Sequence, residues 1–153
     1  MRTFYLLLIG VTFAFAAVTA TAQTADQDAV RVPLENYIKG HATADGEYMK
    51  KAFHTEGDLI FIRDGKVTKR SFADYIAGFT GKPAADEAKR KWSIESVDVF
   101  GNAAAGKIVL DYPNARIVDY MSLLKINGEW KIVNKIFYTE PKAAPAADSK
   151  KAN

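Results

Sequence analysis

The dipeptide Asn127-Gly128 constrains the fold more than any other feature, because it separates two long runs of mixed apolar and polar residues. Asn-Gly is the pair that a two-residue type I′ turn favours, since both central positions need a positive φ. Such a turn fixes the register of the two strands, and side chains alternate between the faces of a sheet. One face is therefore predicted to carry five cross-strand pairs: Lys125 with Trp130, Leu123 with Ile132, Met121 with Asn134, Asp119 with Ile136, and Ile117 with Tyr138.

This face is the more apolar of the two, so we expect it to turn toward the protein core. It also carries two polar groups, Asp119 and Asn134, as diagonal neighbours. A buried carboxylate without partners is costly, so each group must be hydrogen-bonded or must line a hydrated cavity. Two interpretations stay open: a structural hydrogen bond, or a polar pair that orients a ligand in a mostly apolar pocket.

The opposite face of the hairpin mixes lysines with apolar side chains, namely Val118, Tyr120, Leu124, Val133 and Phe137. A half-apolar exposed sheet face is typical of a contact between two copies of a chain, so it predicts a homodimer through the sheet. The alternative is a simple amphipathic surface, on which lysine stems cover the rings.

The first half of the domain is predicted to be helical. One helical face is formed by residues at spacings of three and four, namely Leu34, Tyr37, Ile38 and His41. Asp45 can cap a second helix, and Ser71 with Asp74 resembles the capping box of a third. The expected buried residues of these two helices are Tyr48, Met49, Ala52 and Phe53, followed by Phe72, Tyr75, Ile76 and Phe79.

The second half of the domain is predicted to form strands over residues 91–100, 104–112, 116–126 and 129–138, after a short hairpin over residues 59–68 that turns at Asp64-Gly65. Short connections of this kind make neighbouring strands antiparallel. Helices followed by a long meander indicate an α+β fold, with helices packed on one side of a curved mixed or antiparallel sheet.

Residues 1–22 are predicted to be a secretory signal peptide. The alternative is a membrane anchor, but the apolar run is short for a span and a small-residue site follows it directly. Arg2 gives a basic start, residues 4–18 are apolar and uncharged, and Ala20-Thr21-Ala22 supplies small residues at a cleavage site before Gln23. The folded domain is then expected over residues 23–140, followed by a disordered tail over residues 141–153. The mature protein is expected in the periplasm or outside the cell, with no membrane contact after cleavage.

The composition excludes several kinds of site. The chain has no cysteine, which excludes disulfides and thiol catalysis, and its net charge of +3 is too balanced to indicate nucleic-acid binding. The sequence contains no phosphate-binding glycine loop and no nucleophile elbow. Its two histidines have no spaced third ligand, so neither a metal nor another cofactor is expected.

Both histidines are candidates for function. His41 ends the apolar stripe of the first helix, where it either packs or reaches the cavity of Asp119 as an acid–base partner. His54 either binds the last carbonyls of the second helix or faces a ligand. The other candidate ligand contacts are mostly aromatic residues that form core or wall a pocket: Tyr37, Phe53, Met121, Trp130, Asn134 and Tyr138.

Several segments together resemble a known family: residues 37–45, 52–54, 64–66, 71–76 and 119–120, and above all the run 123–137. They are similar to the nuclear-transport-factor-2-like superfamily, in the branch named for lumazine binding (SnoaL-like). The likeness extends over about residues 30–138, and Ala44 stands where the family pattern leads us to expect glycine.

The resemblance implies a cone, with helices over a curved sheet around a cavity, often in a homodimer. The superfamily includes isomerases, dehydratases, polyketide cyclases and pure binding domains. Its steroid isomerases place an acidic base on the strand after the second helix, whereas residues 59–62 here are apolar. That difference argues against the same mechanism.

Three functions are therefore consistent with the sequence. The first is a non-catalytic domain that binds a small, partly planar organic molecule oriented by Asp119 and Asn134. The second is a cofactor-independent isomerase, dehydratase or cyclase in which Asp119 or His41 acts as general base. The third is a dimeric interaction domain with a vestigial pocket.

Overall fold

The computed structural model describes residues 26–143. The predicted signal peptide and most of the predicted tail lie outside this range. Within it, no helix is both long and apolar enough to span a bilayer. The strand β6 ends at Pro141, one residue beyond the predicted end of the domain.

The chain forms helices first and then a long meander of strands. A helix over residues 26–43 is followed by α2 (Gly46–Ala52), β1 (Phe53–Arg63), β2 (Lys66–Ser71), α3 (Phe72–Ile76), the short 3-10 helix η1 (Glu87–Lys89), β3 (Lys91–Phe100), β4 (Ala103–Asp111), β5 (Ala115–Ile126) and β6 (Glu129–Pro141). The six strands lie in one sheet in the order β2-β1-β6-β5-β4-β3. The pair β1–β6 is parallel and the others are antiparallel.

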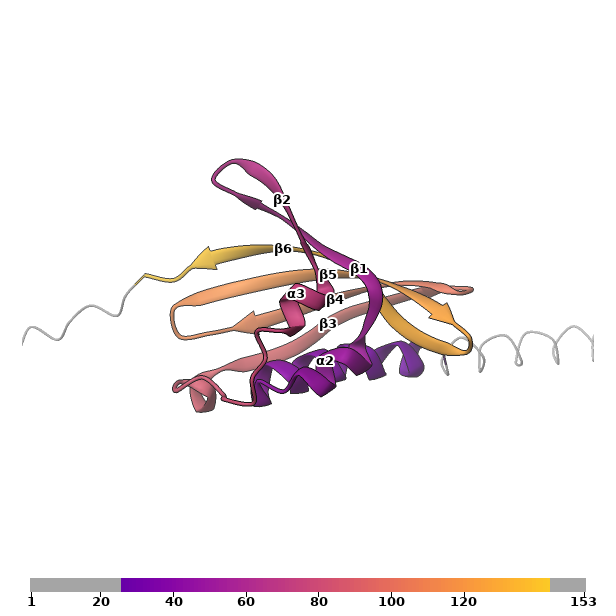
Figure 1. Cartoon of the computed structure of the whole chain (residues 1–153), viewed down its shortest axis with the longest axis horizontal. Coiled ribbons are helices and arrows are strands. Elements are labelled where there is room, and N and C mark those ends of the chain that lie inside the picture. The colour runs from indigo at the N-terminus through magenta and orange to yellow at the C-terminus, as the bar shows by residue number, and fades with distance from the viewer. Residues whose placement is uncertain (1–25, 144–153) are drawn as a thin grey trace, which may run out of the picture.

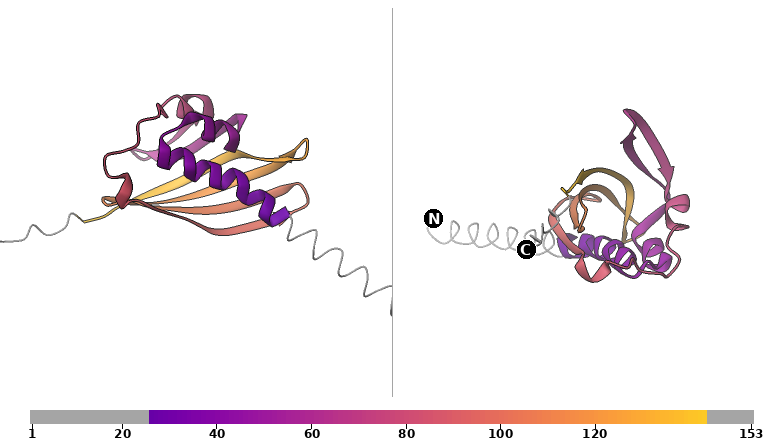
Figure 2. Two further views of the ribbon diagram at one scale, coloured as in Figure 1. Left: turned by 90° about the horizontal axis from the view of Figure 1, so that it is seen from below. Right: turned by 90° about the vertical axis from the view of Figure 1, so that its left-hand side faces the viewer.

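The sheet curls around the helices, which cover its inner face (Figure 2). The hairpin of β1 and β2 projects from the body of the protein as an arm (Figure 1). This arrangement confirms the predicted α+β cone with a mixed sheet.

The N-terminal helix packs its predicted stripe against the inner face of the sheet. Val30, Leu34 and Tyr37 are fully buried. A Cβ on Gly106 of β4 would lie 2.8 Å from the side chain of Leu34, so glycine lets the helix approach the strand closely. The helix runs through Pro33 and ends at residue 43.

The other two helices are shorter than expected. Asp45 and Ser71 cap them as predicted, accepting from the backbone amides of Glu47 and Asp74. However, α2 ends at Ala52, so Phe53 begins β1 instead of closing the helix. Phe79 follows the end of α3 and still packs against the core.

The Asn127-Gly128 turn forms as predicted, but the register beyond it does not hold. Asn127 and Gly128 both have positive φ, and the pairs Lys125–Trp130 and Leu123–Ile132 are confirmed. The register then shifts, so that Asn134 lies opposite Ser122 and Lys135 opposite Met121. The extra residue is Val133, which forms a β-bulge.

The bulge reverses the orientation of β6 but leaves β5 unchanged. Asp119 faces the core as predicted and is fully buried, but it lies opposite Phe137 instead of Ile136. Lys135 is buried in the position expected for Asn134. The prediction that Asn134 shares the inner face with Asp119 is therefore wrong.

Candidate functional site

A buried polar triad lies between the N-terminal helix and the inner face of the sheet. The hydroxyl of Tyr37 donates to Asp119 Oδ2 at 2.6 Å, and Lys135 Nζ donates to the Tyr37 hydroxyl at 2.5 Å. Lys135 Nζ also lies 3.0 Å from Asp119 Oδ1, as an ion pair and not as an aligned hydrogen bond. The three groups therefore contact one another in a closed ring, in which Asp119 Oδ1 has the ion pair with Lys135 and no hydrogen bond among the described residues.

Three aromatic rings surround the ammonium of Lys135. Its Nζ lies 4.8 Å from the ring centre of Phe137, 4.9 Å from that of Tyr37 and 5.4 Å from that of Tyr75. A cation near the faces of aromatic rings is attracted by their quadrupoles. Burial lowers the pKa of Lys135, while the Asp119 carboxylate acts in the opposite direction.

A second polar cluster surrounds His41. Its Nε2 lies 2.7 Å from the hydroxyl of Tyr75, and its Nδ1 lies 3.5 Å from the hydroxyl of Tyr112. A neutral imidazole has one donor and one acceptor nitrogen, so one hydroxyl donates to the ring and the other accepts from it. Burial lowers the pKa of His41, and the charges of Lys135 and Arg90 act in the same direction.

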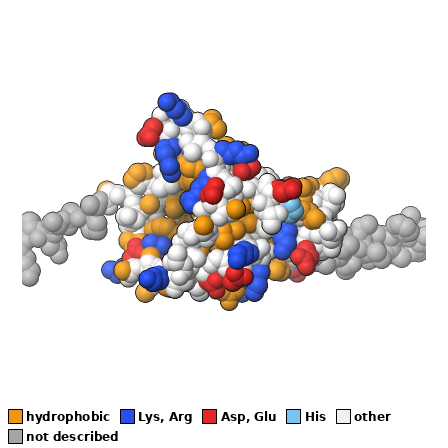
Figure 3. Space-filling view, in the orientation of Figure 1, with side chains coloured by type: hydrophobic (Ala, Val, Ile, Leu, Met, Phe, Trp, Pro, Cys, Tyr) orange, Lys and Arg blue, Asp and Glu red, His pale blue; other side chains and the backbone are white. Residues whose placement is uncertain are grey.

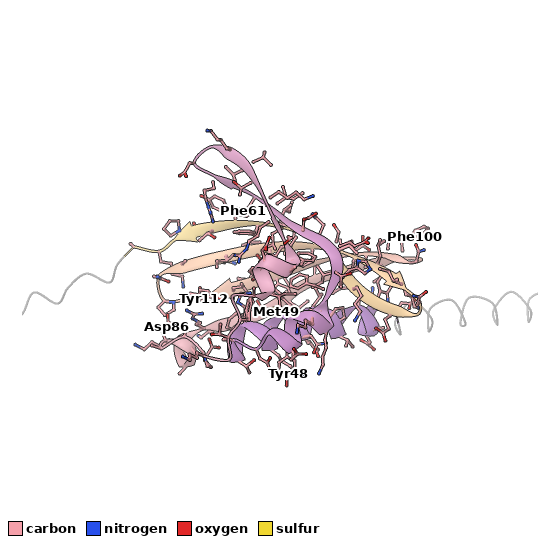
Figure 4. All side chains as sticks on the ribbon, viewed as in Figure 1. Tyr48, Met49, Phe61, Asp86, Phe100 and Tyr112 are labelled. Carbon is pink, nitrogen blue, oxygen red and sulfur yellow. The ribbon has the colours of Figure 1, made fainter. Side chains whose placement is uncertain are left out.

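This cluster lies at the end of the sheet where Arg90 stacks on Tyr112. The guanidinium of Arg90 is 4.1 Å from the ring centre of Tyr112 and is held by Asp86. Figure 4 shows Tyr112 and Asp86 at this end, with Phe100 at the opposite end of the molecule. The ring of Trp92 lies 5.6 Å from that of His41 and completes the aromatic surroundings.

The two clusters touch through Tyr37, whose ring centre lies 4.6 Å from that of His41. Within residues 26–143, no hydrogen bond joins His41 to Asp119, because Tyr37 takes the carboxylate. Of the two alternatives for His41, the direct acid–base pair with Asp119 therefore does not form, and the imidazole packs among aromatic rings.

A pocket of about 430 Å³ lies outside this buried core, between α2, the start of β1, and α3. Its lining is mostly apolar and consists of Lys50, Phe53, His54, Thr55, Phe72, Ala73, Ile76 and Ala77. Figure 3 shows hydrophobic side chains gathered on this face, where Figure 1 places α3 and β1. The volume falls within the range of roughly 300–1,000 Å³ that is usual for small-molecule sites.

Two stacked rings form the wall of this pocket. The ring centres of Phe53 and Phe72 lie 4.0 Å apart with an interplanar angle of 34°. Gly57 makes room for this arrangement, since a Cβ there would lie 2.1 Å from the Phe72 ring. The ring centre of Phe53 lies 5.7 Å from that of Tyr37, so Phe53 packs directly against a member of the buried triad.

The predicted ligand contacts fall into three groups. Phe53 and His54 line the α2–α3 pocket. Tyr37, Met121 and Trp130 are buried in the core. Asn134 and Tyr138 lie on the outer face of the sheet, where Asn134 donates to the carbonyl of Asp58 and Tyr138 is 70% exposed.

The sequence interpretation missed Lys135 and the role of Phe72 in the pocket wall. A signal for Lys135 exists in the run 132–137, where the apolar pairs Ile132-Val133 and Ile136-Phe137 break the alternation of a regular strand. Such a break indicates a bulge. Phe72 was placed correctly on a buried helix face, but only the tertiary contact with Phe53 makes it part of a wall.

Comparison with known proteins gives the same fold. The model of a family described as "Putative lumazine-binding" matches residues 25–138. A nuclear-transport-factor-2-like protein of unknown function from Shewanella baltica is 27% identical with a TM-score of 0.70, over 78% of this chain and 97% of that one. A CaMKII hub from S. rosetta is 17% identical with a TM-score of 0.57, over 74% of this chain and 96% of the hub.

Among characterised proteins, the aldolase FrzH from Cladobotryum sp. is 21% identical over 119 residues, which are 78% of this chain and 95% of that protein. The family match covers most of the chain and the cone agrees with it. The chain belongs to the "Putative lumazine-binding" family of the nuclear-transport-factor-2-like superfamily.

Proposed function

We propose that this protein binds a small, partly planar organic molecule in the α2–α3 pocket without transforming it. The observation that carries the proposal is the ligand-sized, mostly apolar pocket between α2 and α3, with the buried rings of Phe53 and Phe72 beneath its accessible lining. A mostly apolar lining with a few polar groups is typical of sites for small organic molecules. We propose, from the predicted secretory signal, that the protein performs this function in the periplasm or the medium.

In this proposal the site lies on the side of the cone, next to α2 and α3, and not at its centre. Tyr37, Asp119 and Lys135 contact one another and are at most 3% exposed, so their polar atoms are not accessible to a ligand in this pocket. In this proposal the triad packs behind Phe53 and does not contact the ligand, and Asn134 has no part in binding.

A thermal-shift screen of the full chain against pteridines, flavins and small aromatic acids tests binding. A molecule that binds only the native state raises the melting temperature in a concentration-dependent way. In the variant Ala73→Trp, a large side chain replaces an exposed residue of the pocket lining and should abolish the shift. Ala85→Trp, on an exposed turn outside the pocket, is the matched control and should retain it. Shifts that persist in Ala73→Trp would place the ligand elsewhere.

A catalytic function is the second candidate, and two observations favour it. FrzH, which is matched over 95% of its own length, is named as an aldolase. The lowered pKa of His41 keeps its ring neutral at neutral pH, as a general base requires, beside the hydroxyls of Tyr75 and Tyr112. In this case Asp119 acts through Tyr37, and His41→Gln abolishes turnover of a carbonyl substrate while Ala73→Trp leaves it intact.

A homodimer through the sheet is the third candidate and is compatible with either of the others. The outer face of β5 and β6 exposes large apolar side chains, among them Tyr120, Ile136 and Tyr138. A CaMKII hub also shares the fold.

A further inference from the structure

The chemistry of the pocket rim narrows the class of ligand, and this inference rests on the function proposed above. Among the residues that line the α2–α3 pocket, Lys50 is the one with a formal charge. His54 contributes a second polar group at the lining. Its Nδ1 accepts from the backbone amide of Glu56 at 3.3 Å, so a neutral ring carries its proton on Nε2 as a donor.

Lys50 stands at the boundary between two hollows. A second hollow, of about 580 Å³, shares Lys50, Ile76 and Ala77 with the first. Its remaining lining includes the carboxylates of Asp45 and Glu47. The trough along α2 and α3 therefore has an apolar half, a lysine at its middle, and an acidic half.

Charge complementarity fixes where an ionised group of a ligand can lie. An anionic group placed in the acidic half would meet Asp45 and Glu47, whereas at the boundary it would meet the ammonium of Lys50. A cationic group would prefer the acidic half. To reach it, a ligand whose apolar part lies in the apolar half would have to extend past the ammonium of Lys50.

The ammonium of Lys50 is already held by Glu47, at 2.7 Å between Nζ and Oε1. Both side chains are exposed, 63% for Lys50 and 69% for Glu47. An exposed ion pair of this kind contributes little to stability, so a ligand anion can displace Glu47 at small cost.

We propose that the pocket selects a small aromatic anion, whose rings pack against the accessible apolar lining of Ala73, Ile76 and Ala77 while its acidic group replaces Glu47 on Lys50. The ion pair of Glu47 and Lys50 then competes with the ligand and sets its affinity. A neutral aromatic molecule of the same shape binds the same apolar lining without this charge contact.

Two fluorescent probes of similar ring structure separate the charge contact from the apolar contact. 1-Anilinonaphthalene-8-sulfonate carries a sulfonate, and N-phenyl-1-naphthylamine is its neutral counterpart. We expect Lys50→Met in the full chain to lower the affinity for the sulfonate probe about three- to fivefold, and that for the neutral probe by less than about twofold. Glu47→Gln should raise the affinity for the sulfonate probe by about two- to threefold, since it removes the competing carboxylate.

Lys51→Met is the matched control, because Lys51 is the neighbouring lysine of α2 and lies outside both hollows. It should not change the affinity for either probe. The double variant Ile62→Ser/Tyr138→Ser removes apolar side chains of the groove on the outer sheet face, and reports any probe bound there.

The proposal is overturned if Lys50→Met weakens both probes equally, or if neither Lys50→Met nor Glu47→Gln changes the affinity of the sulfonate probe. In those cases a neutral probe that still loses binding in Ala73→Trp supports the proposed binding function without the anion preference. If Ala73→Trp leaves both probes bound, the binding function and the anion preference fail together.

Discussion

At the scale of single residues, the ion pair of Lys135 and Asp119 dominates the interior. Both charges are removed from water, which is expensive, and each is tolerated because the other and the Tyr37 hydroxyl are within reach. The loss of stability on mutation therefore depends strongly on whether one partner or both are removed. Removing one partner leaves a buried charge, whereas removing both leaves a neutral core.

Lys135→Met should lower the free energy of unfolding by about 3–5 kcal/mol, because Asp119 is left buried and unpaired. The double variant Lys135→Met/Asp119→Asn should be more stable than Lys135→Met alone, since the asparagine still accepts from Tyr37 without a charge. Urea denaturation measures both. Lys131→Met, which removes a half-buried lysine paired with Glu129, should change stability by less than about 1 kcal/mol. A Lys135→Met variant as stable as the native chain would contradict the buried ion pair.

His41 should make stability fall as the pH is lowered. Burial lowers its pKa in the folded protein, and the charges of Lys135 and Arg90 act in the same direction, so the folded state stays neutral while the unfolded chain binds a proton below pH about 6.5. The free energy of unfolding then falls by up to about 1.4 kcal/mol for each pH unit below about 6.5.

Urea denaturation between pH 7.5 and 5.5 tests this pH dependence, with the range chosen to bracket the ordinary pKa of histidine. His41→Gln should flatten the profile, because glutamine keeps polar contact with Tyr75 or Tyr112 and cannot titrate. His54→Gln is the matched control and should retain the slope. An unchanged slope in His41→Gln would assign the pH dependence to other groups.

At the scale of elements, the bulge at Val133 marks the limit of what the sequence predicts. The helix stripe, both caps and the Asn127-Gly128 turn follow from local rules, because each depends on residues close in the chain. Alternation also placed Asp119 correctly, since β5 is regular. It failed for Asn134 because one extra residue in β6 reverses every later side chain.

The candidate site was harder to predict than the fold for a related reason. The α2–α3 pocket depends on Phe53 starting a strand, on Phe72 starting a helix, and on Gly57 leaving room between them. These three residues belong to different elements, and only their tertiary contact creates a wall. The sequence predicted Phe53 and His54 as candidate ligand contacts, but in the cavity of the cone and not in a pocket at its side.

The end of the N-terminal helix carries a residue that its geometry disfavours. Ala44 has φ 51°, and the amides of Ala44 and Asp45 bond back to the carbonyls of His41 and Gly40 in a Schellman motif. Ala44→Gly should raise the free energy of unfolding by about 0.5–1 kcal/mol, because glycine adopts positive φ without the Cβ penalty. Ala42→Gly, inside the same helix, should lower it by a similar amount. A destabilised Ala44→Gly would contradict this account.

At the scale of the whole molecule, the unpartnered surface is the outer face of the sheet. The bulge turns Ile136 and Tyr138 outward, where they join Tyr120 at exposures of 48%, 70% and 51%. Ile62 and Val67 of the projecting arm add to this surface, and a groove of about 350 Å³ lies between arm and sheet. A contiguous apolar surface of this kind is typical of a protein interface.

We expect two copies of the chain to pair through this face, because a two-fold contact brings each apolar face against its equal and removes both from water. Light scattering after size exclusion should give a dimer mass for the native chain at micromolar concentration, and Ile136→Glu should give a monomer that keeps its helical and strand content. Phe100→Glu is the matched control, since Phe100 is 92% exposed at the far tip of the sheet, and it should remain a dimer (Figure 4). A native chain that is monomeric across the whole concentration range, or an Ile136→Glu variant that still dimerises, would exclude this interface. Because the α2–α3 pocket lies on the helical side, the monomeric variant should still bind its ligand, which separates assembly from recognition.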